Sequence, residues 1–364
     1  MQHKIIVFVK NKLITLDTVM PILIEMKDKY NISSEIVVFD NLAHEAISKN
    51  IVLKDAIDYV GSELFITKGE KNKPLRLMYI LISLSRIFFS LICGAKIIHF
   101  GLFNLWPFKI LAYMFSNVVY QLQSTAYDFD YSIISIKNKG IKTPLSVGKN
   151  IVIFGLKNAK YYPSVFLKEK KIFFFGETRT RPHWVEYIRS RSDHYFELYH
   201  GDIDCSRGVI VFVLATIDAL ESKRILFEST IQIMKDKSID IPILIKPHSY
   251  TEMKTVHNAI ATHKNMRITY LHPSVLSTRS KAFISNNFSN TLADAYSFGV
   301  TTVEYSNGGV DNLIKPQYVD YLINNDAEEF SNVLDKVLKS TYCPSKFCGT
   351  LGADDELLMS LADR

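Results

Sequence analysis

Two side chains that could bind or protonate a phosphate stand at the end of one apolar run. The run 241–245, IPILI, is followed by Lys246, Pro247 and His248. Proline fixes its own backbone angle and biases the residue before it away from helix, so a strand must stop here. An imidazole in this place can donate to a phosphate oxygen or protonate a leaving phosphate, and Lys246 adds a positive charge. The alternative is an ordinary turn whose histidine is merely exposed.

A second polar cluster follows the next strand-like segment, 281–285. Its hydroxyl and amide groups surround the start of a predicted helix, where unpaired backbone N–H groups favour an anion. The same residue types are the preferred helix caps, so a plain cap without a ligand is the alternative. The residues that could contact a phosphate here are Ser285, Asn286, Ser289, Asn290 and Thr291.

Two further polar loops follow apolar runs in the same half of the chain. The loop 176–181 is interpreted as the first strand-to-helix turn of a second domain, and its Arg179 could pair with a phosphate or carboxylate. A solvated charged loop is the alternative there. Thr216 follows the run 208–214 and could contact a ligand or cap a helix.

Elements that could position these residues alternate along the whole chain. Short runs rich in Ile, Val and Phe are typical of parallel strands buried on both faces, and longer helical patterns lie between them. This alternation predicts an α/β fold of two Rossmann-like, doubly wound domains facing a cleft. In open α/β sheets, ligands bind outside the carboxyl ends of the strands, which is where the polar clusters lie.

The loss of periodicity over 156–170 sets the predicted domain boundary. We predict an N-terminal domain over 1–160, a C-terminal domain over 161–340 and a C-terminal tail over 341–364. Strands are predicted over 4–9, 35–39, 63–67, 96–100, 118–122, 131–136 and 150–154, and over 171–175, 195–199, 208–214, 241–246, 267–270, 281–285 and 301–305.

The composition is that of a globular protein and narrows the range of partners. A formal net charge of +6 over 364 residues suits an anionic substrate or an anionic membrane face, and it does not require nucleic acid. No secretory signal or zinc-type cysteine spacing is visible, so we predict a cytoplasmic location. The run 75–93 is either a buried helix of the first domain or a helix at the inner face of the membrane, because basic residues flank its apolar face.

The motifs resemble those of GT-B glycosyltransferases that build bacterial surface polysaccharides, including sialyltransferase-like and Kdo-transferase-like enzymes. The segment 246–249, KPHS, resembles the HP-type element of bacterial sialyltransferases and the KPHP element of teichoic-acid polyol-phosphate transferases. The cluster from Ser285 resembles the serine-containing motif that follows in the first group and the DYSS element of the second. Asn286 and Asn287 stand where DYSS has acidic and aromatic residues. The resemblance implies a donor nucleotide on the C-terminal domain and an acceptor on the N-terminal domain.

The resemblance also implies roles for individual residues. Glu304 would bind a ribose or sugar hydroxyl, and Thr216 would lie beside the nucleotide base. An inverting enzyme needs a base that takes a proton from the acceptor hydroxyl. The acidic-acidic-Gly triplet that carries this base in sialyltransferases is missing from the sequence. The remaining candidates, each of which could instead be structural, are Asp17, His99, Asp128 and Asp130.

The favoured hypothesis is a metal-independent glycosyltransferase. It would move a CMP-activated acidic sugar, such as sialic acid, a related nonulosonate or Kdo, to a capsule, lipopolysaccharide or lipooligosaccharide acceptor, glycan or lipid-linked. Lys246 and His248 would hold the donor phosphate, and Arg179 the sugar carboxylate. No metal or cofactor beyond the nucleotide sugar is expected. The alternatives are a UDP- or GDP-hexose transferase, a CDP-polyol phosphotransferase, a non-catalytic scaffold, and a UDP-sugar 2-epimerase, whose Ser-Gly-Gly and Glu-Glu signatures are missing.

Overall fold

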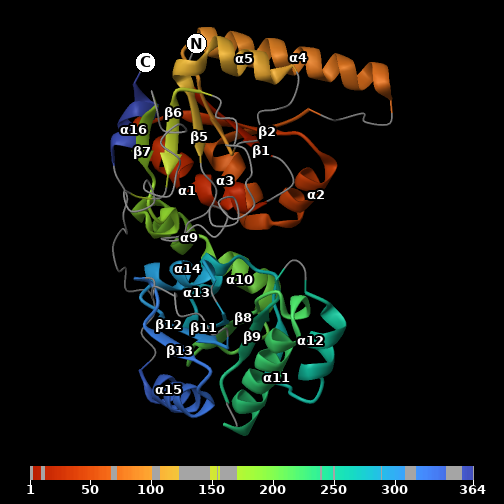
Figure 1. Cartoon of the computed structure of the whole chain (residues 1–364), viewed down its shortest axis with the longest axis vertical. Helices are drawn as coiled ribbons and strands as arrows, with labels where there is room; N and C mark the ends of the chain where they lie inside the picture. Colours follow the sequence, from red (N-terminus) through yellow and green to blue (C-terminus); the bar gives the residue numbers. More distant parts are fainter. Residues whose placement is uncertain are drawn as a thin grey trace, which may run out of the picture. The chain divides into compact units, whose positions relative to one another are not determined.

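The chain forms two compact α/β units, each built on a parallel sheet (Figure 1). Unit 1 comprises Met1–Trp184 together with Thr350–Arg364, and unit 2 comprises Val185–Gly349. The computed structural model describes residues 3–9, 13–66, 72–100, 107–122, 148–153, 155, 170–237, 240–248, 251–287, 289–307, 317–341 and 355–363. Two Rossmann-like domains are the fold class that the sequence predicts, and that prediction is confirmed.

In unit 1, the described residues form a seven-stranded sheet with the order β3-β2-β1-β4-β5-β6-β7. All of its neighbouring strands pair in parallel. The strand residues are almost entirely apolar and buried, as a sheet covered on both faces requires. The strands are β1 (Lys4–Val9), β2 (Ser33–Val38), β3 (Gly61–Phe65), β4 (Lys96–His99), β5 (Val119–Leu122), β6 (Asn150–Ile153) and β7 (Lys171–Phe174).

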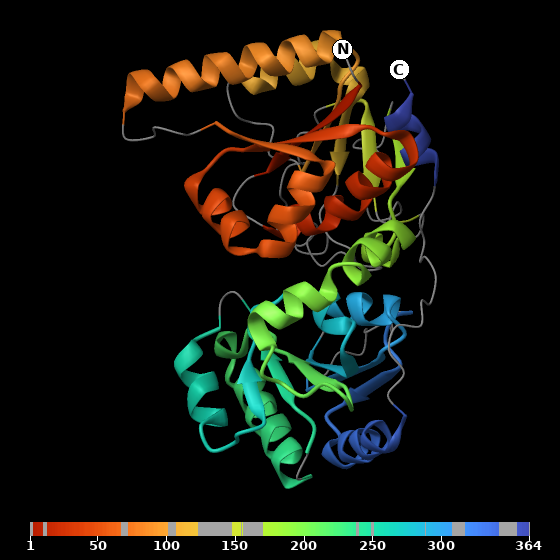
Figure 2. The ribbon, with the colours of Figure 1, turned by 180° about the vertical axis from the view of Figure 1, so that it is seen from behind.

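The helices of unit 1 cover both faces of this sheet. One face packs against α4 and α5, whose apolar side chains share a core with β1, β2 and β4, while α1 and α3 contact the strands elsewhere (Figures 1 and 2). Several helices begin with a side-chain cap, such as Asp40 before α2 and Asn50 before α3. The elements are α1 (Leu13–Tyr30), α2 (Asn41–Lys49), α3 (Ile51–Val60), α4 (Lys73–Ile92), α5 (Phe108–Met114), η1 (Ser116–Val118), η2 (Thr178–Thr180) and α16 (Asp355–Ala362). Helix α9 (Pro182–Arg189) begins in unit 1 and ends in unit 2.

A glycine allows β3 to approach β2 closely. Gly61 pairs with Ser34, and a Cβ on Gly61 would stand 1.9 Å from the carbonyl oxygen of Ser34. Gly61→Ala is therefore expected to lower the free energy of unfolding by about 3 kcal/mol, the upper part of the usual range for overpacking. Urea unfolding of the full chain measures this, with Ser62→Ala, at an exposed neighbour, as the control. An unchanged midpoint for Gly61→Ala would mean that the two strands separate at little cost.

The C-terminal helix α16 belongs to unit 1. It contacts α1 and β7, and the Nε2 atom of His3 lies 2.9 Å from the carbonyl oxygen of Leu361. The hydroxyl of Tyr120 on β5 donates to the carbonyl oxygen of Ser360 at 3.1 Å. The described part of the expected tail is therefore an integral helix of the first unit.

In unit 2, the described residues form a six-stranded parallel sheet with the order β10-β9-β8-β11-β12-β13. This order runs outward in one direction from β8 to β10 and in the other from β11 to β13, so the chain reverses between β8 and β11. The strands are β8 (Val209–Val213), β9 (Ile243–Lys246), β10 (Met266–Ile268), β11 (Ser280–Asn286), β12 (Thr301–Ser306) and β13 (Tyr321–Asn324).

The largest core of unit 2 lies on one face of its sheet, under α11, α12 and α15. It joins Phe212, Ile245 and Ile284 of the strands to Phe227 of α11 and Phe330 of α15. The other face carries α13 and α14, which contact β11. The helices are α10 (Ser192–His200), η3 (Ile217–Ala219), α11 (Glu221–Asp236), α12 (Met253–Ile260), α13 (Pro273–Ser277), α14 (Thr291–Ser297) and α15 (Ala327–Lys339).

The structure differs from the sequence-based prediction in two places. The segment 171–175 was expected to open the second domain, but β7 pairs with β6 as the edge strand of the first sheet. The first unit consequently runs to Trp184 instead of ending at residue 160. The segment 195–199 was expected to be a strand and is part of helix α10, in which Tyr195, Phe196 and His200 are buried. The predicted strand 131–136 lies outside the described residues.

Candidate functional site

The carboxyl edge of the second sheet brings together polar residues from three strands. Lys246 of β9 pairs with Val213 of β8, which pairs with Ser285 of β11, which in turn pairs with Glu304 of β12. Side chains of registered residues on parallel strands point to the same face of the sheet, and adjacent strands lie about 4.8 Å apart. The four residues thus form one row on one face, across the point between β8 and β11 where the strand order reverses. Such a switch point is where ligands bind in this class of fold.

Two polar side chains at the centre of this row are buried without hydrogen-bond partners among the described residues. The Oγ atom of Ser285 and the Oε1 atom of Glu304 make no such bond, and the two side chains are 0% and 1% exposed. Burial raises the pKa of the Glu304 carboxyl to about 7. A buried polar group without a partner costs free energy, so an arrangement of this kind points to a ligand that completes it.

On the opposite face of the sheet, Asn286 is tied into the core. Its side-chain amide donates to the hydroxyl of Thr230 on α11 at 2.9 Å, while its Oδ1 atom has no hydrogen-bond partner among the described residues. Asn286 pairs with Tyr305, whose ring stacks on that of Phe330 with centroids 4.6 Å apart. Asn286 therefore supports the end of β11 from the face of the sheet opposite the row.

The loop after β11 is held by hydrogen bonds of its own. Asn287 has a positive φ of 58°, and its backbone N–H donates to the carbonyl oxygen of Tyr305 at 3.0 Å. The hydroxyl of Ser306 donates to the side-chain oxygen of Asn287 at 2.9 Å. These bonds fix the loop against the end of β12 and so fix the ends of both strands that carry Ser285 and Glu304.

The predicted helix cap at α14 takes a different form from the one expected. Asn290 occupies the capping position, but it makes no side-chain cap hydrogen bond, and the hydroxyl of Tyr318 donates to its Oδ1 atom at 3.4 Å. The hydroxyl oxygens of Ser289 and Thr291 lie 2.7 Å apart. The three residues follow β11 at the edge of the sheet where the row lies.

The ammonium group of Lys246 makes a hydrogen bond within unit 2. Its Nζ atom donates to the carbonyl oxygen of Leu271 at 2.9 Å, which ties the end of β9 to the segment after β10. His248 is exposed. Partial desolvation of its ring, and then the charge of Lys223, lowers the pKa of His248 below its ordinary value. At neutral pH this ring is therefore mainly uncharged and would contact a phosphate as a hydrogen-bond donor. Ser249 lies outside the described residues.

The loop that follows β8 is joined to the loop that follows β9. The Oδ2 atom of Asp218 accepts from the backbone N–H of Glu252 at 2.6 Å. Thr216 precedes the short helix η3 and makes no side-chain cap bond to it. Thr216 and His248 thus follow neighbouring strands at the same edge, which agrees with the predicted grouping of the two loops.

Arg179 belongs to unit 1 and not to the sheet of unit 2. It follows β7 and is 7% exposed, so the alternative of a solvated charged loop is wrong, and residues 177–181 form a buried turn. Its neighbour Arg181 donates from Nη1 to the Oε2 atom of Glu25 on α1 at 2.6 Å. The ion pair between Arg181 and Glu25 attaches this loop to helix α1 in unit 1. Its assignment to the donor site of the second domain is a consequence of the misplaced domain boundary.

The first-unit candidates for a base are dispersed. His99 ends β4 beside β1, at the point where the strand order of the first sheet reverses, and it is 1% exposed. It pairs with Gln121 of β5, a buried amide that the sequence analysis did not single out. Asp17 lies in the second turn of α1 and is half-buried. Asp128 and Asp130 lie outside the described residues.

Sequence reasoning also missed Glu25, Thr230 and the buried pair of His200 and Thr269. The Nε2 atom of His200 lies 2.8 Å from the hydroxyl of Thr269, and burial lowers the pKa of this histidine. Glu25 lies in helix α1, and its neighbours in the sequence do not distinguish it from a solvent-exposed acidic residue. No local sequence signal marks such residues, because the buried partners described here lie 56 or more positions away.

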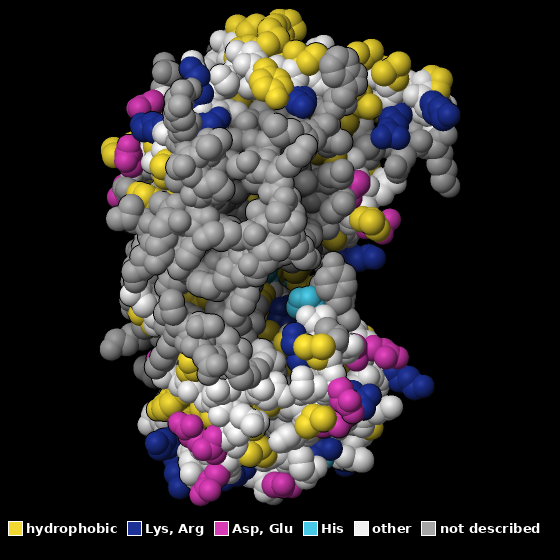
Figure 3. Space-filling view, in the orientation of Figure 1, with side chains coloured by type: hydrophobic (Ala, Val, Ile, Leu, Met, Phe, Trp, Pro, Cys, Tyr) yellow, Lys and Arg dark blue, Asp and Glu magenta, His cyan; other side chains and the backbone are white. Residues whose placement is uncertain are grey.

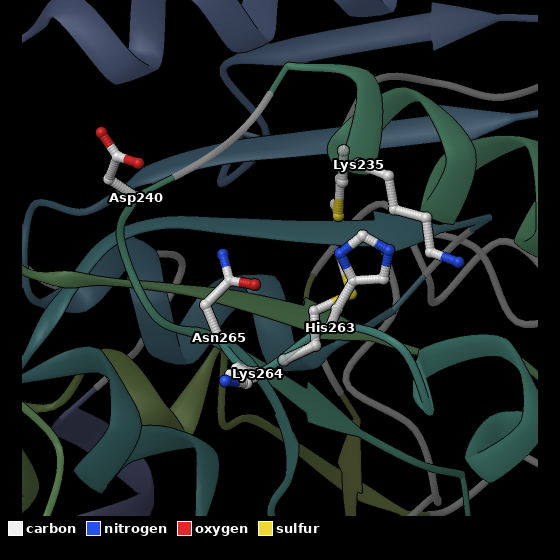
Figure 4. A pocket seen from close by; sticks show the side chains of 7 residues that line it. Lys235, Asp240, His263, Lys264 and Asn265 are labelled. Carbon is white, nitrogen blue, oxygen red and sulfur yellow. The ribbon is translucent and has the colours of Figure 1, made fainter.

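A cavity of about 460 Å³ in unit 2 lies at the wrong end of the sheet for this site (Figure 4). It is lined by residues that precede β9 and β10, at the amino ends of the strands. His263 and Asn265 face its open space, whereas the row of Ser285 and Glu304 ends strands at the opposite edge. Within the described residues, no group of three or more His, Cys, Asp or Glu side chains is arranged to hold a metal ion.

No family model and no curated protein sequence matches the chain. Solved structures with a similar fold include the UDP-GlcNAc 2-epimerase of Methanocaldococcus jannaschii, at 13% identity and a TM-score of 0.64 over 98% of this chain and 99% of that one. The UDP-GlcNAc 2-epimerase of Neisseria meningitidis bound to UDP-GlcNAc is similar at 12% identity, with a TM-score of 0.59 over 92% and 93%. Arabidopsis thaliana UGT89C1 complexed with UDP is similar at 11% identity, with a TM-score of 0.51 over 92% and 91%. At these identities the likeness establishes the GT-B-like fold.

Proposed function

We propose that the chain is an enzyme that binds a UDP-sugar at the carboxyl edge of the second sheet, and that its reaction is the C2 epimerisation of a UDP-N-acetylhexosamine. The observation that carries the first half is the buried pair of Ser285 and Glu304 at the switch point of unit 2. The second half rests on the fold, which the chain shares over nearly its full length with UDP-GlcNAc 2-epimerases.

The row on the second sheet suits a nucleoside diphosphate. A ribose presents two adjacent hydroxyls, which can donate to a carboxylate that has a free acceptor. Glu304 is such a carboxylate, because its Oε1 atom has no hydrogen-bond partner among the described residues. Ser285 beside it can bond a hydroxyl or a phosphate oxygen, and His248 follows the strand two places away in the sheet. The ligand would satisfy groups that are otherwise buried at a cost.

UDP is favoured over CMP by the burial of the arginines. The CMP-linked acidic sugar needed Arg179 or Arg181 to accept its carboxylate. Both side chains are buried, and Arg181 is already paired with Glu25. Two of the similar structures named above carry UDP-GlcNAc or UDP. A neutral sugar on UDP needs no arginine for a carboxylate.

Epimerisation at C2 takes one proton from C2 and adds a solvent-derived proton on the other face of the sugar, so an acid–base group must stand close to C2. The Ser-Gly-Gly signature is missing from this sequence, and Glu-Glu occurs only as Glu328-Glu329 in the first turn of α15. Contacts to the sugar in this chain must therefore differ from those that the signatures provide.

Two measurements on the full chain test the two halves separately. UDP at about 100 times its Kd should add about 2.7 kcal/mol of stability and raise the Tm by several degrees, whereas CMP should not. Incubation with UDP-GlcNAc in D2O, followed by proton NMR, should show deuterium at C2 and the appearance of the C2 epimer. UDP binding without exchange at C2 would reject epimerisation and favour glycosyl transfer. Stabilisation by CMP but not by UDP would reject the nucleotide assignment.

A further inference from the structure

Helix α4 carries a second apolar face that is open to solvent. On α4 the side chains of Leu77, Leu81, Ile82, Phe89 and Ile92 are 52–59% exposed. On the adjacent helix α5, Ile110, Tyr113 and Met114 are 42–63% exposed. We call these eight residues the α4–α5 surface; Figure 3 shows hydrophobic side chains gathered where Figure 1 places these two helices. Soluble proteins rarely expose a contiguous apolar patch of large side chains unless it binds something.

The inner face of α4 accounts for its packing on unit 1. Ser83, Ile87 and Leu91 are buried, and the partly buried Phe88 stacks edge-on against Phe115 at 5.9 Å between ring centroids. These positions are spaced three or four residues apart, as one helix face requires. The core of unit 1 therefore explains the apolar residues on the inner face of α4 and leaves those on its outer face without a role in that core.

The surroundings of the α4–α5 surface are cationic. The sequence from 71 to 127 contains six Lys and Arg residues and no Asp or Glu. Among the residues around this surface, Lys73, Arg76 and Lys109 come from the two helices themselves. Basic residues beside an exposed apolar stripe are the signature of a helix that lies in the headgroup region of an anionic membrane. A second copy of the chain would bring like charges together, so it fits this surface less well.

By length and composition, α4 is also able to cross a membrane, being 20 residues and about 30 Å long. Its attachment to unit 1 argues against such a span. The guanidinium of Arg86 pairs with Glu35 of β2, a carboxylate that is 1% exposed and also lies 3.5 Å from the Nζ atom of Lys4. Removing α4 from the sheet would leave Glu35 with one ionic partner and would expose Ile87 and Leu91.

From these observations we propose that the α4–α5 surface docks unit 1 on an anionic lipid bilayer, with α4 parallel to the membrane plane. The apolar side chains enter the boundary between headgroups and acyl chains, and the basic residues contact lipid phosphates. This inference is independent of the proposed UDP site, because that site is built from residues of unit 2. It places the protein at a membrane surface, whichever reaction unit 2 supports.

The test is sedimentation of the full chain with vesicles of phosphatidylcholine, alone or with 30% phosphatidylglycerol. We expect binding to the anionic vesicles that weakens as salt is raised, because Lys and Arg contacts to the surface are screened. The triple variant Leu81→Ser, Ile82→Ser, Phe89→Ser should lower the partition coefficient by at least about tenfold, because three apolar side chains no longer enter the bilayer. Its Tm and UDP binding should be unchanged.

The matched control replaces two equally exposed apolar side chains of unit 2, Leu198→Ser and Tyr270→Ser, which are 56% and 66% exposed. This control should bind vesicles like the wild type. Equal vesicle binding by the triple variant would overturn the proposal, and so would binding that is indifferent to phosphatidylglycerol. The surface would instead be assigned to a second copy of the chain if the wild type bound neither kind of vesicle and was a dimer, while the triple variant was a monomer.

Discussion

Replacing Glu25 by alanine is expected to lower the free energy of unfolding by about 3–5 kcal/mol, because the change leaves the guanidinium of Arg181 buried without its ionic partner. Arg181 is 2% exposed, and its Nη1 atom donates to Glu25 at 2.6 Å. The Nε and Nη2 atoms of Arg181 have no hydrogen-bond partner among the described residues, so Glu25 carries most of the compensation for this charge. Urea or thermal unfolding of the full chain measures the loss.

Two companion variants separate charge from packing at this pair. Lys29 contacts the same carboxylate at 2.5 Å but is 40% exposed, so Lys29→Ala should cost no more than about 1 kcal/mol. The double variant Glu25→Met, Arg181→Met removes both charges together and should recover most of the lost stability. A Glu25→Ala protein as stable as Lys29→Ala would mean that water hydrates Arg181 and that the ion pair of Glu25 and Arg181 is not shielded from solvent.

The contribution of Glu25 should also depend on pH. Burial alone would raise its pKa, but hydrogen bonds from Lys29 and Arg181, with their charges, outweigh burial and hold the pKa of Glu25 below its usual range. A carboxyl with a depressed pKa stabilises the fold above its ordinary pKa and loses that effect as pH falls through the lowered value. The difference in stability between wild type and Glu25→Ala should therefore be full at pH 6 and should shrink in acid below about pH 4.

Glu304→Gln is expected to make unit 2 more stable at alkaline pH and, at the same time, to weaken UDP binding. The pKa of Glu304 is raised to about 7, so the folded protein keeps a proton that the unfolded chain releases at about pH 4.5. Wild-type stability should therefore fall as pH rises from about 4.5 to 7, by up to about 3 kcal/mol at 1.36 kcal/mol per pKa unit. The glutamine variant should lack this decline, and unfolding at pH 5 and pH 8 measures the difference between the two proteins.

The effect of Glu304→Gln on UDP binding should be unfavourable, whereas its effect on stability is favourable. A hydrogen bond to a charged group contributes about 1.5–3 kcal/mol, so UDP should bind the glutamine variant roughly 10- to 100-fold more weakly at pH 8. Ser285→Ala should weaken UDP binding without removing the pH-dependent decline in stability. Glu228→Gln, at an exposed carboxylate of α11, is the neutral control for both measurements. If Glu304→Gln gains stability but binds UDP normally, Glu304 is buried for a structural reason and the ribose contact is wrong.

Local chemistry made most of the strands and the edge of the second sheet predictable. The run before Lys246 and the run before Ser285 are apolar without alternation, and each forms a buried parallel strand that ends in polar residues. The register that places Lys246, Ser285 and Glu304 on one face could not be read from the sequence, because the paired residues are 19–72 positions apart. The same limit hid the pairing of Arg181 with Glu25.

The errors have a common physical cause. The segment KIFFF at 171–175 has the composition of a strand, but its sequence does not indicate which of the two sheets it joins. In the structure it is the edge strand of the first sheet. The aromatic segment 195–199 has strand-forming residues, yet burial of Tyr195, Phe196 and His200 on one face of α10 overrides that preference. In both cases tertiary packing decided between options that were locally equivalent.

The return of α16 to unit 1 makes unit 2 an insertion within unit 1. Residues of unit 1 lie on both sides of Val185–Gly349, and the strands β5 and β7 receive their last contacts from a helix that ends at Ala362. During synthesis, unit 2 can therefore complete its fold on the ribosome before unit 1 does, although unit 1 starts first. A chain that ends at residue 349, held on the ribosome by a linker long enough to span the exit tunnel, should show a folded second unit while the first lacks the contacts of α16 with α1 and β7.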